Sequence, residues 1–410
     1  MPLHDPTDNP HEAASDGDEP VVSPDGGGTP PDRTPPAVAV TGLTKVYGDE
    51  VLAVDDISFA VAPGDFCVVI GPSGCGKSTT LHSLVGTVEV TAGRIEIDGL
   101  DVTDTPTYDR DIGLVFQDFQ LFPHLTVEEN VRYGVEGTDR EIPDGVVRET
   151  MELMRLLAVR DRAPASLSAG QKQRVALARS LVLRPKVLLL DEPLGDMDYK
   201  LQKRMERELL RVHRELDTTF VYVTHDQTQA MRLADQIVVM NDGKIEQSGT
   251  VDEVYNRPAT AFVAAFVGDS NIFSGTVAGG DGETVDVETP FGPVTCDADP
   301  LPTPVAELRG KTVSVVVRPQ HLELGDGNRN ALDCEVRDVL YQPGAGTQVV
   351  LDATGDDGAT RRLQLLSTER LDLTADDGPI TVSWSPSNAL PLERTSVVAG
   401  TDLQRDILGE

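Results

Sequence analysis

The chain has 410 residues, too many for a single ordinary core, so two folded domains are the starting expectation. Its 68 acidic and 35 basic residues give a net charge of -33, and a surface this negative excludes nonspecific binding to nucleic acid or anionic lipid. Because ions screen such self-repulsion, and because only 8 of the basic residues are Lys, we expect a salt-rich host cytoplasm like that of extreme halophiles.

The sequence also indicates a compartment. No segment approaches the roughly 18 consecutive apolar residues of a membrane span, and the N-terminus lacks a basic region followed by an apolar core. The cysteines show neither metal-ligand spacing nor a paired framework, and they are Cys67, Cys75, Cys296 and Cys334. We therefore expect a protein of the reducing cytoplasm.

Residues 1–36 have the composition of a disordered tail. They contain nine prolines, eight acidic residues and the run Gly26–Gly28, with almost no large apolar side chain. Such a segment cannot bury enough apolar surface to offset the entropy lost on ordering. Structure is expected to begin near residue 37, with strands at 37–40 and 51–61. Tyr47 lies between these strands, where its ring could stack on adenine, although packing is the commoner role for a lone tyrosine.

The stretch after the apolar run 66–70 has the pattern of a phosphate-binding loop. Glycines let the backbone curl so that successive N–H groups point inward, and the following helix adds its positive N-terminal end. Lys77 would reach the β- and γ-phosphates of ATP, and the Ser78 hydroxyl would ligate the accompanying Mg²⁺. An accidental glycine-rich turn is the alternative, but all eight motif positions and their strand–loop–helix context agree. The residues expected to contact nucleotide are Gly71, Pro72, Ser73, Gly74, Cys75, Gly76, Lys77, Ser78 and Thr79.

The next part of the chain alternates strands and helices. A buried-type strand at 112–116 ends at Gln117, and the segment 121–126 then interrupts regular structure. Thr126 and Glu129 fit a capping box at the start of a helix, and helical periodicity runs over 146–159.

Polar residues then gather at the start of a second helix. Ser168, Gly170 and Gln171 precede the helical stretch 173–181, and together they offer hydroxyl, backbone and amide donors to an anion. An ordinary N-cap is the alternative reading.

Two further strands end in residues suited to catalysis. Asp191 and Glu192 follow the apolar run 187–190, so they are expected at the edge where doubly wound sheets bind ligands. Asp191 is placed to hold Mg²⁺, and Glu192 to orient or deprotonate water. His225 ends the strand at 221–224 and could hydrogen-bond a γ-phosphate at the same edge.

Five separated elements agree in type and order, and over roughly 37–267 the chain resembles the nucleotide-binding subunit of an ABC transporter. Within that resemblance Tyr47 is the adenine-stacking aromatic, 71–79 the Walker A loop, Gln117 the Q-loop, 167–171 the signature, Asp191 and Glu192 the Walker B pair, Asp198 the D-loop aspartate and His225 the H-loop.

The resemblance implies an α/β P-loop cassette that works as a head-to-tail homodimer. Ser168, Gly170 and Gln171 of one subunit would cap the γ-phosphate of the ATP held by the partner's Lys77 loop. Gln117 would sense Mg²⁺ and link the site to an integral-membrane permease at the cytoplasmic face. An extracellular solute-binding protein would act indirectly.

Two departures from the family pattern bear on the dimer. Ala169 replaces the usual glycine of the signature, which adds one methyl group where two subunits approach. The D-loop reads Gly195-Asp196-Met197-Asp198, so the usual hydroxyl is missing and an extra carboxylate is present. Communication between the two ATP sites is therefore the least secure part of the resemblance.

From about residue 268 short alternating runs are separated by Gly, Asp and Pro, which predicts a small OB-like β-barrel over 268–410. The stretch 317–322 resembles the signal of the TOBE domain of importer ATPases. Such barrels often bind nucleic acid, but the net charge argues against it here. Dimer contact or spacing is the simplest role, and a ligand sensor around Arg318 or His321 is the alternative.

Taken together, the sequence predicts an ATPase that energises an ABC importer. Residues 121–125 follow Gln117, where this family docks its permease. The cargo expected is ferric iron, polyamine, thiosulfate, sulfate or molybdate, with a sugar importer as the alternative. A soluble ABC ATPase acting on nucleic acid or the ribosome is a different class, but one phosphate loop, no heptad insertion and an acidic surface argue against it.

Overall fold

The computed structural model describes residues 35–48, 50–136, 143, 145–195, 197–356 and 358–393. Of the predicted tail at 1–36, residues 1–34 lie outside this range, and so does Asp196 of the D-loop. Among the described residues no helix is both long enough and apolar enough to cross a membrane.

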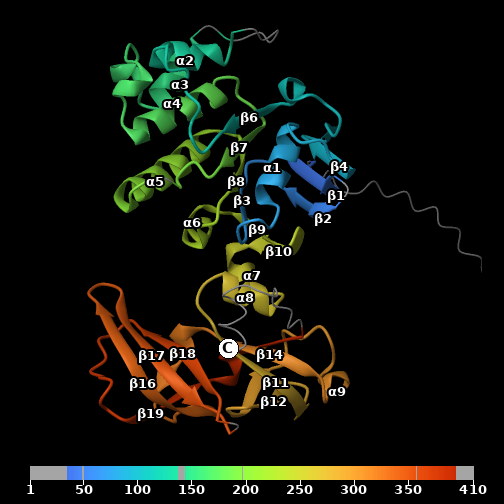
Figure 1. Ribbon diagram of the computed structural model, residues 1–410, viewed down its shortest axis with the longest axis vertical. Helices are drawn as coiled ribbons and strands as arrows, with labels where there is room; N and C mark the ends of the chain where they lie inside the picture. Colours follow the sequence, from blue (N-terminus) through green and yellow to red (C-terminus); the bar gives the residue numbers. More distant parts are fainter. Residues whose placement is uncertain are drawn as a thin grey trace, which may run out of the picture. The chain divides into compact units, whose positions relative to one another are not determined.

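The N-terminal part of the chain is built on a six-stranded sheet with the order β10-β9-β3-β8-β7-β6 (Figure 1). Neighbouring strands from β9 to β6 run parallel, and only β10 is antiparallel to its neighbour β9. The predicted strands at 66–70, 112–116, 187–190 and 221–224 all belong to this sheet. Its members are β3 (Phe66–Ile70), β6 (Ile112–Val115), β7 (Val187–Asp191), β8 (Thr219–Val223), β9 (Gln236–Asn241) and β10 (Lys244–Thr250).

This sheet is buried on both faces, which explains its nearly continuous apolar strands. Successive side chains alternate between two cores: Phe66 and Val68 join one, whereas Cys67 and Val69 join the other. The first core contains apolar residues of α4, α5 and α6, and the second those of α1 and a smaller antiparallel sheet. That smaller sheet has the order β2-β1-β4-β5 and consists of β1 (Val38–Tyr47), β2 (Val51–Val61), β4 (Ala92–Ile97) and β5 (Leu100–Asp101).

The helices begin where the sequence offers caps. Thr126 and Ser168 each form a capping box, with Glu129 and Gln171 respectively, so the predicted cap at Thr126 is confirmed. The helices of this part are α1 (Lys77–Val85), α2 (Val127–Tyr133), α3 (Val146–Leu153), α4 (Ala169–Leu181), α5 (Tyr199–Glu215), α6 (Gln227–Leu233), α7 (Val251–Asn256) and α8 (Ala261–Phe266).

One helix prediction is wrong in its extent. The periodicity over 146–159 predicts a single helix, but α3 ends at Leu153 and a separate 3₁₀ turn follows at Leu157–Val159. Between them Arg155 has a φ of 54°, a left-handed conformation that an α-helix cannot continue through. Apolar residues at helical spacing remain buried on both sides of this break, so periodicity alone did not reveal it.

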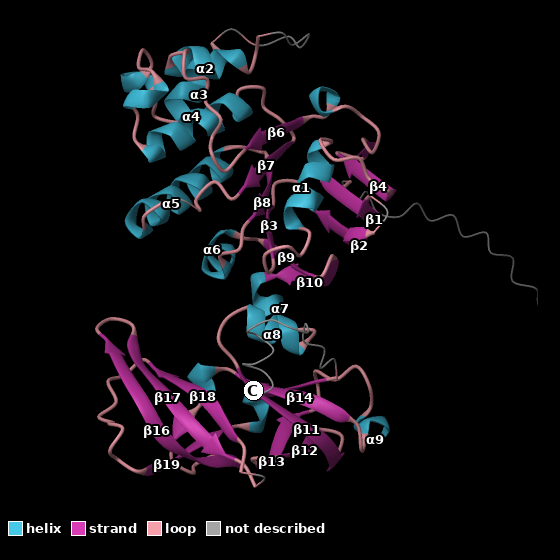
Figure 2. Cartoon of the chain, viewed as in Figure 1, coloured by secondary structure: helices cyan, strands magenta, loops and turns pink. Residues whose placement is uncertain are grey.

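The C-terminal part is mostly strand (Figure 2) and forms two five-stranded antiparallel sheets around one core. The described strands thus form two sheets rather than the single barrel expected. Phe273 and Trp384 stack in this core with ring centroids 5.7 Å apart. The first sheet, in the order β13-β12-β11-β14-β20, contains β11 (Asn271–Gly280), β12 (Thr284–Thr289), β13 (Gly292–Asp297), β14 (Thr312–Val317) and β20 (Ala389–Leu392). The second, in the order β15-β19-β16-β17-β18, contains β15 (Glu323–Leu324), β16 (Asn330–Gln342), β17 (Gly346–Thr354), β18 (Thr360–Ser367) and β19 (Pro379–Trp384). A short helix, α9 (Val305–Leu308), precedes β14.

The net charge of -33 makes a prediction about salt. Because repulsion between carboxylates is screened within a few ångströms in concentrated salt, the melting temperature should rise by about 5 °C or more between about 0.1 M and about 2 M KCl. Circular dichroism melts measure it, and sucrose serves as an uncharged control for exclusion from the surface. Equal melting temperatures in dilute and molar KCl would show that the expected salt-rich cytoplasm is wrong.

Candidate nucleotide-binding site

The phosphate loop runs from the end of β3 to the start of α1, and its glycines are required by close packing. A Cβ at Gly71 would lie 2.2 Å from the carbonyl oxygen of Met240, and one at Gly76 would lie 2.5 Å from that of Ala53. Gly74 and Gly76 also have φ values of +83° and +101°, which L side chains rarely adopt. The loop is therefore held tightly between β9 and β2 in a conformation that only glycine permits.

The start of α1 leaves backbone donors available for a ligand. The first N–H groups of a helix have no intrahelical acceptor. Here the N–H of Thr80 donates to the Gly76 oxygen at 2.9 Å, whereas those of Lys77, Ser78 and Thr79 have no acceptor within the described part of the chain. Several free N–H groups at the positive end of a helix, in a glycine loop, fit a phosphate group.

Lys77 is 6% exposed, and its ammonium lies inside this loop. Its Nζ donates to the carbonyl oxygens of Gly71 and Pro72, each at 2.8 Å, and lies 3.8 Å from the Sγ of Cys75. Burial raises the pKa of the Cys75 thiol, with Lys77 opposing this shift, so the thiol acts as a packing group. The lysine charge is thus held in the same loop as the free N–H groups.

The two acidic residues lie at the end of β7, as expected. Glu192 has a left-handed φ of 43°, and its N–H donates to the oxygen of Val223 at 3.1 Å, so the residue after β7 is still bonded to the end of the neighbouring strand β8. Burial raises the pKa of Asp191, and the neighbouring Glu192 carboxylate adds to this shift, whereas His82, 3.9 Å away, lowers it.

The donor set at this edge fits Mg²⁺. Asp191 supplies a carboxylate, Ser78 at the start of α1 a hydroxyl, and Gln117 after β6 an amide oxygen. These are hard oxygen ligands, and Mg²⁺ is usually held through one or two carboxylates together with the phosphates of the nucleotide. Among the described residues there is no group of three or more His, Cys, Asp or Glu that could hold a metal ion.

The structure brings Glu192, His225 and Gln117 together. The Nδ1 of His225 lies 2.9 Å from the Oε2 of Glu192. A Cβ at Gly195 would lie 3.7 Å from the Nε2 of Gln117 and 3.8 Å from Glu192 Oε2, so the Gln117 side chain borders the same glycine as the Glu192 carboxylate that contacts His225. Glu192 is largely enclosed, whereas His225 is exposed and open to a ligand.

Tyr47 ends β1 and pairs with Val51 at the turn into β2. Tyr47 is 42% exposed, with the Lys45 ammonium 4.9 Å from its ring centroid, so the ring is partly accessible to a stacking partner. Because Ala53 on the same hairpin touches Gly76, the ring lies on the strand pair that packs against the phosphate loop.

The signature residues have a local structural role in this chain. The Ser168 hydroxyl accepts from the Gln171 N–H at 3.4 Å, and the Gln171 oxygen accepts from the Ser168 N–H at 2.9 Å. Gly170 is buried, and a Cβ there would lie 3.1 Å from the Met205 sulfur on α5. The two interpretations of this stretch, an ordinary N-cap and an anion-binding helix start, are compatible, because a capped helix also presents the positive N-terminal end of α4. In the described chain no hydrogen bond or ion pair joins these residues to the phosphate loop.

Asp198 caps α5, with its carboxylate accepting from the Leu201 N–H at 3.1 Å. The D-loop aspartate is thus engaged within its own chain at the start of the helix that packs on Gly170.

Side-chain hydrogen bonds that the sequence did not predict hold the segment after Gln117. Phe119 and Gln120 have left-handed φ values of 61° and 41°, and the guanidinium of Arg179 on α4 donates to both carbonyl oxygens, at 3.1 Å and 2.7 Å. The buried Asn130 side chain adds bonds to Phe122 and to the oxygens of two residues beyond it. No local pattern predicts the two Arg179 bonds, because Arg179 lies about 60 residues away in sequence.

Of the two residues considered for a sensor in the C-terminal part, Arg318 is buried and His321 is half-buried. Arg318 is 5% exposed, and its guanidinium lies 4.2 Å from the centroid of the Tyr255 ring while donating to oxygens at the C-terminal ends of α7 and α8 and just after α8. These oxygens and one hydroxyl belong to Tyr255 (2.6 Å), Ala264 (2.9 Å), Gly268 (3.3 Å), Asp269 (3.1 Å) and Ser270 (2.6 Å). Burial, and then Arg318, lower the pKa of His321. Arg318 thus bonds the chain to itself, as a cation at helix C-termini does.

Comparison with known proteins identifies the family. Residues 54–195 match the ABC transporter model, and residues 315–392 match the TOBE domain model. A spermidine/putrescine import ATP-binding protein of Acidothermus cellulolyticus is 43% identical over 383 residues, which cover 88% of this chain and 95% of the relative. The chain belongs to the ABC transporter family. It is an ATP-binding subunit of the importer type, so the predicted family, the cassette fold with an all-β TOBE region, and ATP hydrolysis are confirmed.

Other relatives of this ABC subunit agree. An uncharacterized ABC transporter ATP-binding protein, YdcT of Escherichia coli, is 37% identical over 359 residues, covering 87% of this chain and 98% of the relative. The solved structure of cbiO1 from Clostridium perfringens, part of the ABC transporter complex cbiONQ, is 29% identical with a TM-score of 0.50, covering 54% of this chain and 90% of that chain.

Proposed function

We propose that ATP binds to the loop 71–79 and that Glu192 polarises the water that attacks its γ-phosphate. The observation that carries this proposal is the 2.9 Å contact between Glu192 and His225 beside Gln117, at the edge of the sheet next to the phosphate loop. Lys77 and the free N–H groups of α1 would hold the phosphates, and Tyr47 would stack on the base. Catalysis in phosphoryl transfer rests on such positioning and charge stabilisation.

Mg²⁺ would be held by Ser78, Gln117 and Asp191, and when bound it neutralises charge on the phosphates. The chain's own residues do the remaining work. Asp191 would present a carboxylate from the end of β7. The Nδ1 of His225 contacts and orients Glu192, and the other ring nitrogen of His225 would hydrogen-bond the γ-phosphate.

The site is incomplete in one chain, so we propose a head-to-tail homodimer. The positive end of α4, with Ser168, Gly170 and Gln171, makes no hydrogen bond or ion pair to the phosphate loop within the described chain, and it would cap the ATP held by the partner. The permease would dock on 121–125 at the cytoplasmic face of the membrane. The proposed regions of the chain are an N-terminal tail at 1–36, the ABC ATPase domain at 37–267 and the TOBE-like domain at 268–410. The TOBE-like domain would serve dimer contact or spacing.

For the cargo we propose a polyamine. The relatives named as spermidine/putrescine import ATP-binding proteins are 38–45% identical to this chain, and the Acidothermus protein matches over 95% of its length. Polyamines are among the cargoes that the sequence leaves open, together with ferric iron, thiosulfate, sulfate and molybdate, and the sugar importer remains the alternative.

Uptake measurements test the cargo. Deleting the gene for this chain in its host should abolish uptake of radiolabelled spermidine and putrescine, and the wild-type chain should restore it, whereas Glu192→Gln should not. Maltose uptake in the same cells is the control and should stay unchanged. If polyamine uptake is retained and uptake of a sugar, iron or sulfate is lost, the chain belongs to the importer of that solute instead. Unchanged uptake of all solutes, with ribosomal partners recovered on affinity capture, would favour the soluble class.

A further inference from the structure

A cluster of arginines lies between the start of α4 and the side of α5. A cavity of about 70 Å³ is lined there by three arginines, a hydroxyl and one carboxylate, namely Arg155, Arg174, Arg204, Ser168 and Glu208. Burial lowers the pKa of Arg174; Glu208 opposes this shift, whereas Arg204 and Arg155 add to it. The cavity therefore carries an excess of positive charge.

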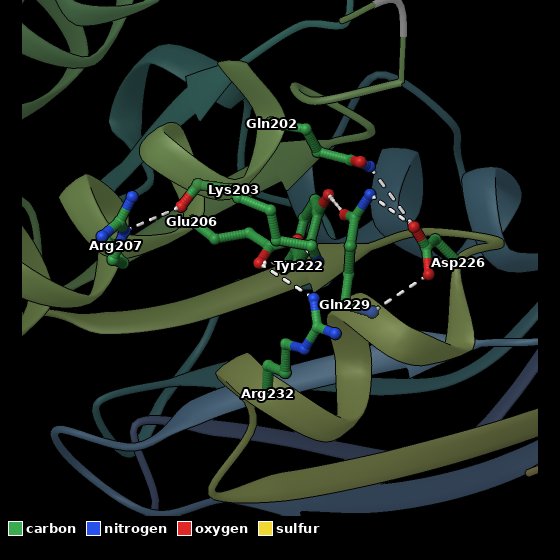
Figure 3. A network of polar contacts seen from close by, with 8 residues as sticks. All are labelled: Gln202, Lys203, Glu206, Arg207, Tyr222, Asp226, Gln229 and Arg232. Atoms are coloured by element: carbon green, nitrogen blue, oxygen red, sulfur yellow. Dashed lines mark hydrogen bonds and ion pairs between the residues drawn. The ribbon is translucent and has the colours of Figure 1, made fainter. Parts of the chain in front are cut away.

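Two carboxylates of α5 that could neutralise this charge are already engaged by other cations. Both oxygens of Glu208 accept hydrogen bonds from Arg211, at 2.8 Å and 3.3 Å. Glu206 pairs with Lys203 at 2.8 Å and with Arg232 of α6 at 3.6 Å (Figure 3). The helix thus gives the arginines of the cavity little compensation.

The three arginines have no acceptor of their own. Within the described part of the chain, no hydrogen bond or ion pair involves the guanidinium group of Arg155, Arg174 or Arg204, and the Nε of Arg174 is buried without a partner. A buried donor without a partner costs stability, and cations held close together repel one another. A bound anion would relieve both costs.

The segment that carries the cluster also differs in charge from the rest of the chain. Residues 127–215 hold 17 of the 35 basic residues but only 16 of the 68 acidic ones, so this segment is nearly neutral in a chain with a net charge of -33. Because a strongly negative surface repels anions, the remainder of the chain is a poor place for an anion site. Residues 127–215 do not present that barrier.

The donors around the cavity fit a small oxyanion. A guanidinium group offers several N–H donors in a planar fork that matches the oxygens of phosphate. The Ser168 hydroxyl accepts from the Gln171 N–H at 3.4 Å, so its own proton is available to a ligand. The volume of about 70 Å³ suits one small ion and is too small for a nucleotide, since pockets for larger ligands have about 300 Å³ or more.

We propose that Arg155, Arg174 and Arg204, with the Ser168 hydroxyl, form a binding site for inorganic phosphate, the product of the ATP hydrolysis that this subunit carries out. None of the described residues that line the cavity belongs to the loop 71–79, so this is a second phosphate site. The same donors would also suit the terminal phosphate of ATP held by a partner subunit, and that source is distinguished by experiment.

Calorimetric titration with inorganic phosphate tests the site directly. In a Lys77→Met chain, whose phosphate loop has lost its cation, one phosphate per chain should bind with a Kd of about 1 mM. Adding Arg155→Gln and Arg204→Gln should weaken this binding about tenfold or more, because a lost hydrogen bond to a charged group costs about that factor. Since neither guanidinium has a partner to lose in the described chain, the melting temperature should not fall.

A matched control removes the same charge elsewhere. Arg214→Gln with Arg309→Gln, at two exposed positions outside the cluster, should leave phosphate binding by the Lys77→Met chain unchanged. If the chain with both Arg155 and Arg204 replaced does not fold by circular dichroism, Arg204→Gln alone decides, with a smaller loss of affinity expected. Absence of phosphate binding, affinity that survives these replacements, or an equal loss in the control would overturn the site.

Sedimentation in ATP distinguishes the two sources of phosphate. In a Glu192→Gln chain, the closed dimer expected from the proposed function should form equally well with Arg155→Gln and Arg204→Gln added, if the cluster takes free phosphate. Loss of the dimer on adding these replacements would assign the cluster to the partner's ATP and overturn the proposal. Absence of the dimer in Glu192→Gln itself would contradict the proposed homodimer, whereas the phosphate site is then decided by the titration alone.

Discussion

Replacing Glu192 by Gln should lower the kcat of ATP hydrolysis by about 100-fold or more, since a positioned general base contributes about that much. The side chain lies 2.9 Å from His225, and an amide keeps the shape of the site and a hydrogen-bonding group there. ATP binding should persist, because Lys77 and the N–H groups of α1 are unchanged. The variant should also accumulate as a closed dimer in ATP, because the carboxylate charge no longer opposes the triphosphate.

Phosphate release measures the turnover of this variant, a fluorescent ATP analogue measures binding, and sedimentation measures the dimer. Glu335→Gln, an exposed position on β16, makes the same chemical change far along the chain and should behave as wild type. Wild-type turnover in Glu192→Gln would remove this residue from the catalytic role. Loss of ATP binding together with turnover would instead indicate damage to the loop.

Phe122→Asp should reduce recruitment of the chain to membranes containing its permease by about 30-fold or more, the cost typical of losing an aromatic anchor of an interface. The structure sharpens this prediction. The Phe122 ring is half-buried, with its centroid 4.3 Å from that of Tyr133 and 5.3 Å from the Arg179 guanidinium. The adjoining Pro123 and His124 are exposed, so the segment presents a surface that Phe122 supports from within.

Because Phe122 also packs internally, its replacement needs matched controls. Phe122→Leu keeps an apolar side chain and should retain most recruitment, whereas Pro123→Asp alters only the exposed surface and should lose it. Tyr108→Asp adds the same charge at a residue that is 85% exposed elsewhere and should leave recruitment unchanged. Co-sedimentation with membranes, at equal ATP binding, is the measurement. Undiminished recruitment of both Phe122→Asp and Pro123→Asp would place the permease contact elsewhere.

The sequence by itself determined the elements whose causes are local. The phosphate loop, the strand before it and the helix after it follow from glycines and apolar residues at adjacent positions, and α1 begins at Lys77 as that motif demands. The caps at Thr126 and Ser168 follow from a side chain and its neighbour three residues on.

Only the tertiary structure decided where these elements meet, because their contacts join residues distant in sequence. The pairing of Glu192 with His225 depends on β7 and β8 lying side by side, and on a left-handed turn at Glu192 that no local propensity favours. Because α4 packs on α5, a side chain at Gly170 would crowd the Met205 sulfur. Arg179 bonds the left-handed residues Phe119 and Gln120, which lie about 60 positions away in sequence. Likewise the Gln229 side chain bonds to both Tyr222 and Asp226 only because β8 and α6 meet in the folded chain.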